Sequence, residues 1–289
     1  MNLRYNIFLS IIKYNYLGDA MKKIFIVIII IVIIFLFLIY PKRNESDDKN
    51  DNLNYESKYS FYKLENKERY LVFQDKNKDL DFEEVIVRVN LNLDREFYTD
   101  TKLTNNLNTN YVLVNKYNYL DKDYVPDNLV KIEKYTDKEI FLVKEAMDNF
   151  IKMGDDMSNL GMTIRAISGY RSYSYQENLY NNYVLKDGIS LADTYSARAG
   201  FSEHQTGLVV DIDNGRVNYE DFENTDEYTW LKDNSYKYGF ILRYPQKRES
   251  ITGYSYESWH YRYVGVDIAK IIYESDMTFD EYYAKYIDN

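Results

Sequence analysis

The hydrophobic pattern separates an apolar N-terminal segment from the rest of the chain. Residues 24–40 (IFIVIIIIVIIFLFLIY) are apolar throughout and carry no charge, whereas residues 44–58 are polar and acidic. A helix of this length rises roughly 26 Å, which is the short end of the range for crossing a bilayer. Branched apolar side chains on every face fit lipid better than a one-sided core. Because no small-residue cleavage site follows, the segment predicts an uncleaved signal anchor.

Basic residues predict how this anchor is oriented. Arg4, Lys13, Lys22 and Lys23 precede the span, whereas Lys42 and Arg43 follow it. The positive-inside rule then favours a cytoplasmic N-terminus, although a start at Met21 would remove most of the bias. We therefore expect a cytoplasmic segment at 1–23, a transmembrane helix at 24–40, an acidic linker at 41–64, an N-terminal extension at 65–135 and a globular domain at 136–289.

Strands and helices alternate irregularly in the globular part. Alternating apolar residues at 83–93 favour a strand or a short helix. Apolar runs predict strands at 162–168, 208–212 and 258–263, and apolar spacing of three and four predicts helices at 136–151, 174–184, 226–238, 266–273 and 279–287. Thr136 and Glu139 fit a capping box at the start of the first of these helices. Without a regular βαβ rhythm, an α+β fold is favoured.

Composition narrows the possible chemistry. The 289 residues carry a net charge of −10, which a nucleic-acid backbone would repel, so no nucleic-acid partner is expected. Cysteine is absent, which removes disulfides, thiolate metal sites and cysteine nucleophiles. A metal ion would have to bind His, Asp or Glu, and the chain contains only two histidines.

Each histidine lies in a short string of chemically suggestive residues. His204 lies in SEHQTGLVVD, which ends at Asp211, and His260 lies in ESWHYRY, which follows Glu257. We expect His204 to precede a strand that carries Asp211, and His260 to lie on a strand that can pair with it. Two imidazoles and one carboxylate are a common ligand set for catalytic zinc. Glu257 could then act as a general base, while a core or surface histidine is the alternative for each string.

These strings, together with Ser168-Gly169-Tyr170-Arg171-Ser172 and Gln176, resemble the metallo-D-alanyl-D-alanine carboxypeptidases of the VanY type. That zinc-peptidase group shares its fold with the hedgehog signalling domain. The resemblance covers roughly residues 111–264. It implies that residues 136–289 form a zinc carboxypeptidase domain, which removes the C-terminal D-alanine from peptidoglycan stem peptides. It also implies a location outside the cytoplasmic membrane of a Gram-positive-type envelope.

The resemblance assigns expected roles to individual residues. One Zn²⁺ per chain would be bound by His204, Asp211 and His260, and Glu257 would be the catalytic base. Arg171 would stabilise the oxyanion of the scissile carbonyl. Gln176 and Ser202 would contact the substrate. We expect Arg198 and Arg243 to form salt bridges. Trp259 and Tyr263 either line the pocket or pack in the core, and the core is favoured.

Other functions remain open at this point. The motifs do not separate a D,D-carboxypeptidase from an L,D-carboxypeptidase that acts on tetrapeptide stems. A non-catalytic wall-binding module of the same fold and an endopeptidase of the same fold are further alternatives. Ser60-Phe61-Tyr62-Lys63 matches the S-x-x-K string of penicillin-binding proteins, but the companion strings are absent. We expect a monomer.

Overall fold

The computed structural model describes residues 23, 24, 26–28, 30 and 55–288. Lys58–Asn289 forms a compact unit separate from Met1–Ser57. Within the described residues, no helix combines the length and the apolar character needed to cross a bilayer. Most of the predicted span at 24–40 lies outside the described residues, as does most of the linker. The anchor therefore stays a prediction.

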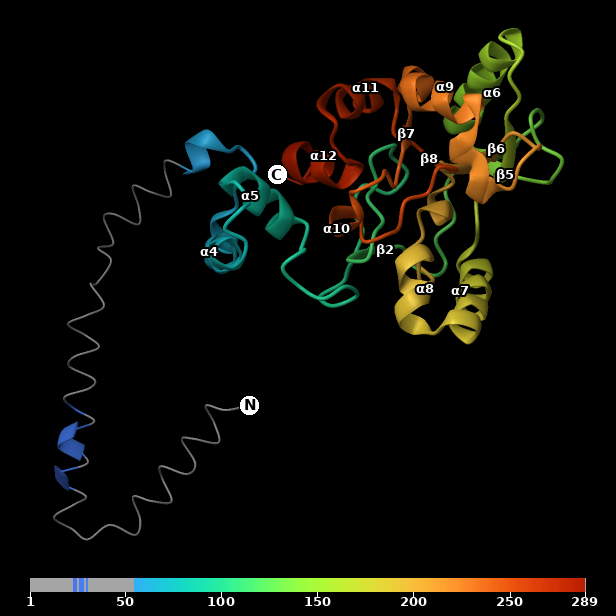
Figure 1. Ribbon diagram of the computed structural model, residues 1–289. Helices are drawn as coiled ribbons and strands as arrows, with labels where there is room; N and C mark the ends of the chain where they lie inside the picture. Colours follow the sequence, from blue (N-terminus) through green and yellow to red (C-terminus); the bar gives the residue numbers. More distant parts are fainter. Residues whose placement is uncertain (1–22, 25, 29, 31–54, 289) are drawn as a thin grey trace. The chain divides into compact units, whose positions relative to one another are not determined.

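A four-stranded antiparallel sheet forms the centre of the larger unit (Figure 1). Its strands run in the order β5-β6-β8-β7, with bounds Arg165–Ser168, Val209–Asp213, His260–Tyr263 and Phe240–Leu242. Strands predicted at 162–168, 208–212 and 258–263 are thereby confirmed. Their antiparallel pairing and the surrounding helices make the unit α+β, as the irregular rhythm predicted.

The two faces of this sheet have different characters. Val210 and Ile212 of β6 and Tyr261 of β8 belong to a large apolar core, which also contains Phe150 and Met153 of α6 (Lys144–Asn159). Because side chains alternate across a strand, the intervening residues point to the opposite face. Asp211, His260 and Arg262 lie there together.

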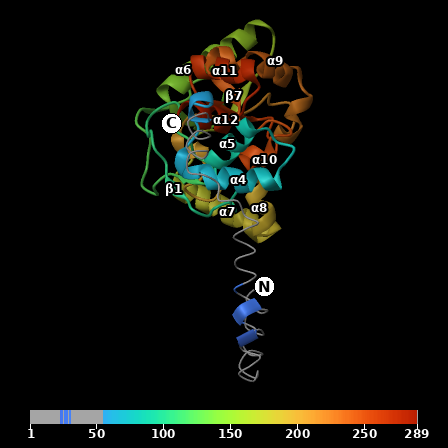
Figure 2. The same cartoon turned by 90° about the vertical axis from the view of Figure 1, so that its left-hand side faces the viewer.

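Helices surround the sheet on several sides (Figures 1 and 2). α11 (Val266–Ser275) and α12 (Phe279–Tyr286) share a second apolar core with Ile241 of β7. α7 (Tyr173–Asp187) and α8 (Ile189–Tyr195) pack on each other between β5 and β6 in the sequence. Within residues 59–288 the remaining helical elements are α4 (Lys67–Lys76), α5 (Phe82–Asn90), α9 (Asp226–Asn234), α10 (Glu249–Thr252), η1 (Leu64–Asn66), η2 (Glu203–Thr206), η3 (Tyr219–Asn224) and η4 (Ser235–Tyr238).

Most of the predicted helices are present at their expected places. The segment 83–93 forms α5, which is the helical one of the two forms that its pattern allowed, and a capping box at Asp81 and Glu84 starts it. α7, α11 and α12 match their predictions, and α9 with η4 covers 226–238. Gly239 ends η4 at φ 81°, in the left-handed conformation that favours glycine.

The helix predicted at 136–151 is wrong in its first half. β3 (Leu129–Lys131) and β4 (Phe141–Val143) form an antiparallel hairpin, so α6 begins only at Lys144. Thr136 does not cap a helix. Its hydroxyl accepts from the Lys138 amide at 3.1 Å in a turn and donates to the Ala166 carbonyl at 3.0 Å. Ile140 and Leu142, two residues apart as in a strand, enter the core from this hairpin, whereas Phe141 between them is exposed. The other short sheet pairs β1 (Lys102–Leu103) with β2 (Asn118–Tyr119) in parallel.

Candidate metal centre and catalytic cavity

The two histidines and Asp211 converge on one buried cluster. Each of the three residues offers one ligand atom, and the three atoms lie within 4.8 Å of one another. Asp211 and His260 are register partners on β6 and β8, whereas His204 lies in η2, just before β6. This is the arrangement expected from the two sequence strings.

A backbone contact fixes the orientation of His204. Its Nδ1 lies 2.7 Å from the Gly169 carbonyl oxygen, to which it can donate. The lone pair of Nε2 is then free for a cation. The backbone at position 169 packs so closely against the β4 hairpin that only glycine fits. A Cβ there would lie 2.6 Å from Cγ2 of Ile140 and 2.7 Å from the Phe141 carbonyl oxygen.

A second glycine links the histidine turn to the strand. Gly207 ends η2 at φ 67°, in the left-handed region. A Cβ there would lie 2.7 Å from a methyl carbon of Leu129. Both restrictions favour glycine at this position, and the sharp turn lets β6 begin two residues later. His204 and Asp211 are thereby held on the same side of the sheet.

Asp211 has the geometry of a metal ligand. Its Oδ2 lies 3.4 Å from Nε2 of His204, and its Oδ1 lies 3.3 Å from Nδ1 of His260. Ligands about 2.0–2.1 Å from a tetrahedral zinc ion are separated by about 3.3 Å. Oδ1 is buried and has no hydrogen-bond partner among the described residues. An unsatisfied carboxylate oxygen between two imidazoles therefore fits a divalent cation.

Charges around the cluster also favour a cation. Burial, and secondarily the positive charge of Arg171, lower the pKa of His204 to about 4, so its imidazole is neutral. Burial alone would lower the pKa of His260, but the nearby carboxylates of Asp211, Glu203 and Glu257 raise it well above 6.5. The carboxylates around His260 thus attract positive charge, which a bound metal ion would supply in place of a proton.

Glu257 lies beside the three potential ligands. Its Oε2 is 3.2 Å from Nδ1 of His260, and the side chain is 11% exposed. Burial raises the pKa of Glu257 above its usual value of 4.5, which the nearby His260 offsets only in part. A carboxylate of raised pKa at the edge of the cluster is suited to accept and return a proton.

Arg171 contacts the cluster from the loop between β5 and α7. One guanidinium nitrogen donates to Oδ2 of Asp211 at 2.7 Å, and Nε donates to the Ser168 hydroxyl at 2.9 Å. The side chain is 21% exposed, so part of it remains accessible to a ligand. A fixed cation therefore stands next to the potential metal site.

The cluster opens into a cavity of about 590 Å³. Gln176 and Ser202 line it and are buried, with Oε1 of Gln176 unpartnered among the described residues. Trp259, which we expected in the core, is half-buried and lines the cavity, whereas Tyr263 lies in the core as expected. Aromatic side chains make up much of the wall, namely Tyr175, Tyr183, Tyr195, Tyr219, Tyr244, Tyr254 and Tyr256.

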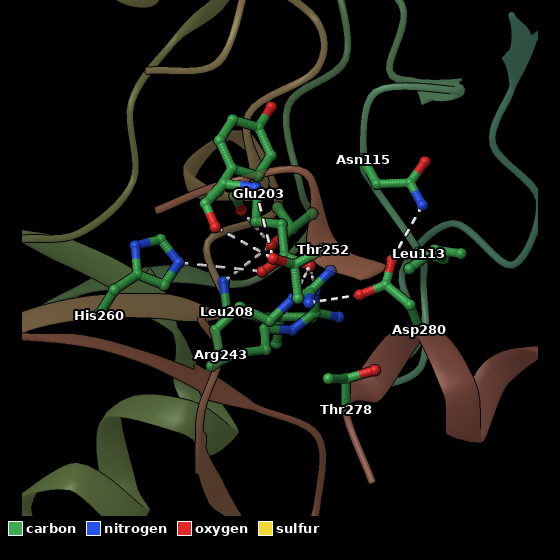
Figure 3. A network of polar contacts seen from close by, with 12 residues as sticks. Leu113, Asn115, Glu203, Leu208, Arg243, Thr252, His260, Thr278 and Asp280 are labelled. Atoms are coloured by element: carbon green, nitrogen blue, oxygen red, sulfur yellow. Dashed lines mark hydrogen bonds and ion pairs between the residues drawn. The ribbon is translucent and has the colours of Figure 1, made fainter. Parts of the chain in front are cut away.

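Sequence reasoning missed a buried ionic network behind His260 (Figure 3). Glu203 accepts hydrogen bonds from Arg243 and Arg262, both at 2.9 Å, and Arg243 also donates to Asp280. Arg243 thus forms the expected salt bridge, and Arg198 does so with Asp193. A signal for this network was available, because Arg262 follows His260 by two residues on a strand and must therefore share its face.

Known proteins resemble this chain in sequence and in fold. The family model described as "VanY: D-alanyl-D-alanine carboxypeptidase" matches residues 139–266. The "Putative carboxypeptidase YodJ" of Bacillus subtilis (strain 168) is 40% identical over 207 residues, which cover 67% of this chain and 76% of that protein.

Two solved structures extend the comparison. The LdcB LD-carboxypeptidase is 42% identical, with a TM-score of 0.57 over 60% of this chain and 85% of that chain. A mutant of the vancomycin-resistance D,D-pentapeptidase VanY from a VanB-type cassette, in complex with Zn(II), is 32% identical, with a TM-score of 0.52 over 60% of this chain and 98% of that chain. This protein therefore belongs to the VanY family of D-alanyl-D-alanine carboxypeptidases.

Proposed function

We propose that this chain is a zinc-dependent D,D-carboxypeptidase that removes the terminal D-alanine from peptidoglycan stem peptides. The observation that carries the proposal is the convergence of His204, Asp211 and His260 beside Glu257, at the base of a cavity large enough for a peptide end. Membership of the VanY family and the substrates named for its relatives support this assignment.

His204, Asp211 and His260 would hold the zinc ion. When bound, zinc supplies Lewis-acid chemistry to the scissile amide. The unpartnered Oδ1 of Asp211 and the neutral imidazole of His204 suit this role. Glu257 is left out of the ligand set, and its carboxylate faces the same space.

Glu257 carries the proton transfer in the proposed reaction. Its carboxylate accepts a proton from the attacking water while the water oxygen bonds to the amide carbon. The same carboxyl group returns that proton to the leaving nitrogen as the C–N bond breaks, which releases free D-alanine. The raised pKa of Glu257 suits both halves of this exchange.

Arg171 is proposed to stabilise negative charge on the reacting carbonyl oxygen. It is held by Ser168 and Asp211, so little reorganisation is needed when that charge develops. Gln176 and Ser202 are proposed to bind the polar end of the peptide. The free Oε1 of Gln176 can accept a hydrogen bond from a backbone N–H of the peptide, while Nε2 of Gln176 donates to the Ala197 carbonyl at 2.8 Å.

A second candidate is an L,D-carboxypeptidase acting on tetrapeptide stems. The 42% identity to the LdcB LD-carboxypeptidase favours it specifically. The two activities are distinguished by incubating the zinc-loaded protein with pentapeptide and tetrapeptide stems and measuring the masses of the products by mass spectrometry. Loss of one alanine from the pentapeptide alone supports D,D-specificity, and cleavage of the tetrapeptide alone would replace it with L,D-specificity.

The same assay tests the non-catalytic alternative. A wall-binding module would bind stems without cleaving them, so neither substrate would lose mass. In an active enzyme, EDTA should abolish cleavage and added zinc should restore it. The matched variant Glu257→Gln, which keeps the side-chain shape, controls for contaminating peptidases.

The proposed substrate also favours a location outside the cytoplasmic membrane. Stem peptides are part of the cell wall, and the apolar segment at 24–40 could anchor the domain beside it. Protease added to wall-stripped intact cells should then degrade the domain. Protection that disappears only after detergent lysis would place the domain inside instead.

A further inference from the structure

The two histidines of the metal centre are supported in different ways. His204 is oriented by a backbone group, the Gly169 carbonyl, which no side-chain substitution removes. His260 directs Nδ1 at Asp211 and Glu257, at 3.3 and 3.2 Å, so its Nε2 lies on the far edge of the ring. That nitrogen is buried and lacks a hydrogen-bond partner among the described residues.

Glu203 faces this unpartnered nitrogen (Figure 3). Its Oε2 lies 3.9 Å from Nε2 of His260 and is likewise buried without a hydrogen-bond partner in the described part of the chain. A neutral imidazole that offers the Nδ1 lone pair to a metal must carry its proton on Nε2. A donor on His260 and an acceptor on Glu203 therefore face each other, and a shift of about 1 Å would bring them to the 2.7–2.9 Å of a charge-assisted hydrogen bond.

Glu203 itself is held firmly from the other side. Its side chain is fully buried, and Oε1 accepts from Nε of Arg243 and from a terminal nitrogen of Arg262. Both arginines are also fully buried. With one carboxylate oxygen fixed by two cations, Oε2 has a defined direction, which is toward His260.

The network continues to distant parts of the chain. Arg243 donates to Asp280 of α12, and Asp280 accepts from the Asn115 side chain at 3.0 Å. Arg262 donates to the carbonyl oxygens of Asn110 and Val112. Two carboxylates thus balance two guanidinium groups in the buried interior. Desolvation makes such a network costly compared with apolar packing, so a role beyond folding is a reasonable hypothesis for it.

We propose that Glu203 is a positioning residue of the metal centre. Its Oε2 accepts from Nε2 of His260, which sets the ring orientation and the tautomer and presents Nδ1 to the zinc ion. The adjacent His204 is a ligand itself, so one turn of helix η2 supplies one ligand and orients the other. The role rests on the zinc site of the proposed function but does not require that the substrate be a stem peptide.

Nuclear magnetic resonance on the wild-type protein tests the tautomer directly. The chain has only two histidines, so a ¹⁵N-histidine label on the zinc-loaded full chain in detergent micelles yields two ring systems. We expect His260 to carry a slowly exchanging proton on Nε2 and to bind zinc through Nδ1, with the opposite pattern in His204. Coordination of His260 through Nε2, or rapid exchange of an Nε2 proton with solvent, would overturn the proposal.

Zinc affinity tests the contribution of Glu203. Glu203→Gln removes the charge, and Glu203→Asp keeps the charge for the arginines but withdraws the carboxylate from His260. For a carboxylate that supports a ligand histidine, each change should weaken zinc binding by roughly 10–100-fold in competition with a chromophoric chelator. Glu227→Gln is the matched control, because Glu227 is equally buried but is paired with Asn214 and Arg216.

The outcomes separate this inference from the proposed function. Unchanged zinc affinity in a folded Glu203 variant contradicts the positioning role, even if the wild type cleaves stem peptides. Weakened affinity in both Glu203 variants but not in Glu227→Gln supports it, even if no stem peptide is cleaved. Should both Glu203 variants fail to fold, the histidine tautomers of the wild type still decide the question.

Discussion

Asp211 and His260 are register partners on neighbouring antiparallel strands, and Oδ1 of Asp211 lies 3.3 Å from Nδ1 of His260. The pairing of β6 with β8 therefore brings together two potential ligands that are 49 residues apart in the sequence. A shift of one residue in the register of either strand would move its ligand residue to the apolar face of the sheet. The register of β6 and β8 therefore determines whether the proposed metal site can form.

Loss of a ligand should remove the metal. His204→Ala and His260→Ala each leave two of the three ligand residues, which is too few for a stable zinc site. We expect zinc content, measured by elemental analysis after dialysis, to fall from about one ion per chain to a small fraction of that. Full zinc content in both variants would contradict the proposed site, provided that circular dichroism shows them folded.

Removal of Glu257 should separate metal binding from catalysis. Glu257→Ala leaves all three ligands intact, so zinc content should remain near that of the wild type. Cleavage of the peptide should fall by about 10²–10⁴-fold, the usual contribution of a positioned acid–base group. Glu274→Gln, on the exposed side of α11, is the control and should keep full activity. Loss of zinc from Glu257→Ala would instead make Glu257 a ligand.

Arg171 should affect both charge stabilisation and the ligand that it holds. Arg171→Ala should lower the rate by about 10²–10³-fold, as for other groups that stabilise an oxyanion. Since Arg171 also donates to Oδ2 of Asp211, we expect a smaller weakening of zinc binding, which the sequence alone did not indicate. Arg171→Lys should restore only part of the rate, because a point charge cannot reproduce two directed hydrogen bonds. A rate equal to that of the wild type in Arg171→Ala would remove Arg171 from the mechanism.

A buried lysine outside the metal centre should make stability rise with pH. Lys116 is buried beneath the rings of Phe97 and Tyr254, and burial lowers its pKa to about 8 from 10.5. Between these two values the unfolded chain binds more protons than the folded protein. The folded state is therefore favoured increasingly as the pH rises from about 8 to 10.5.

Urea denaturation of the wild type and of Lys116→Met at pH 7, 8, 9 and 10 measures this effect. The stability of the wild type relative to the variant should grow over the range, with a slope of at most about 1.4 kcal/mol per pH unit. The variant controls for the titration of other groups. A difference that stays constant with pH would show that the pKa of Lys116 is not lowered.

The sequence by itself predicted which residues form the candidate site, because its signals are local. The two histidine strings, the Gly169 and Arg171 loop and the strands at 208–212 and 258–263 all lie in short segments, and their residue types restrict the chemistry. His204, Asp211 and His260 could be predicted to form one cluster on the single assumption that the two predicted strands pair. The fold class followed from the irregular order of strands and helices.

Other features depend on contacts between segments that are distant in the sequence. The hairpin of β3 and β4 replaced the first turns of a predicted helix. The spacing of Ile140 and Val143 matched a helix, but the pairing of β4 with strand β3 decided the structure here. Glu203 faces His260 and is itself held by Arg243, which also binds Asp280. These three charged residues come from distant segments, and in the sequence each resembles an ordinary surface residue. Local pattern reports which face of an element is apolar, but the partners of a buried charge are set only when the whole chain has packed around it.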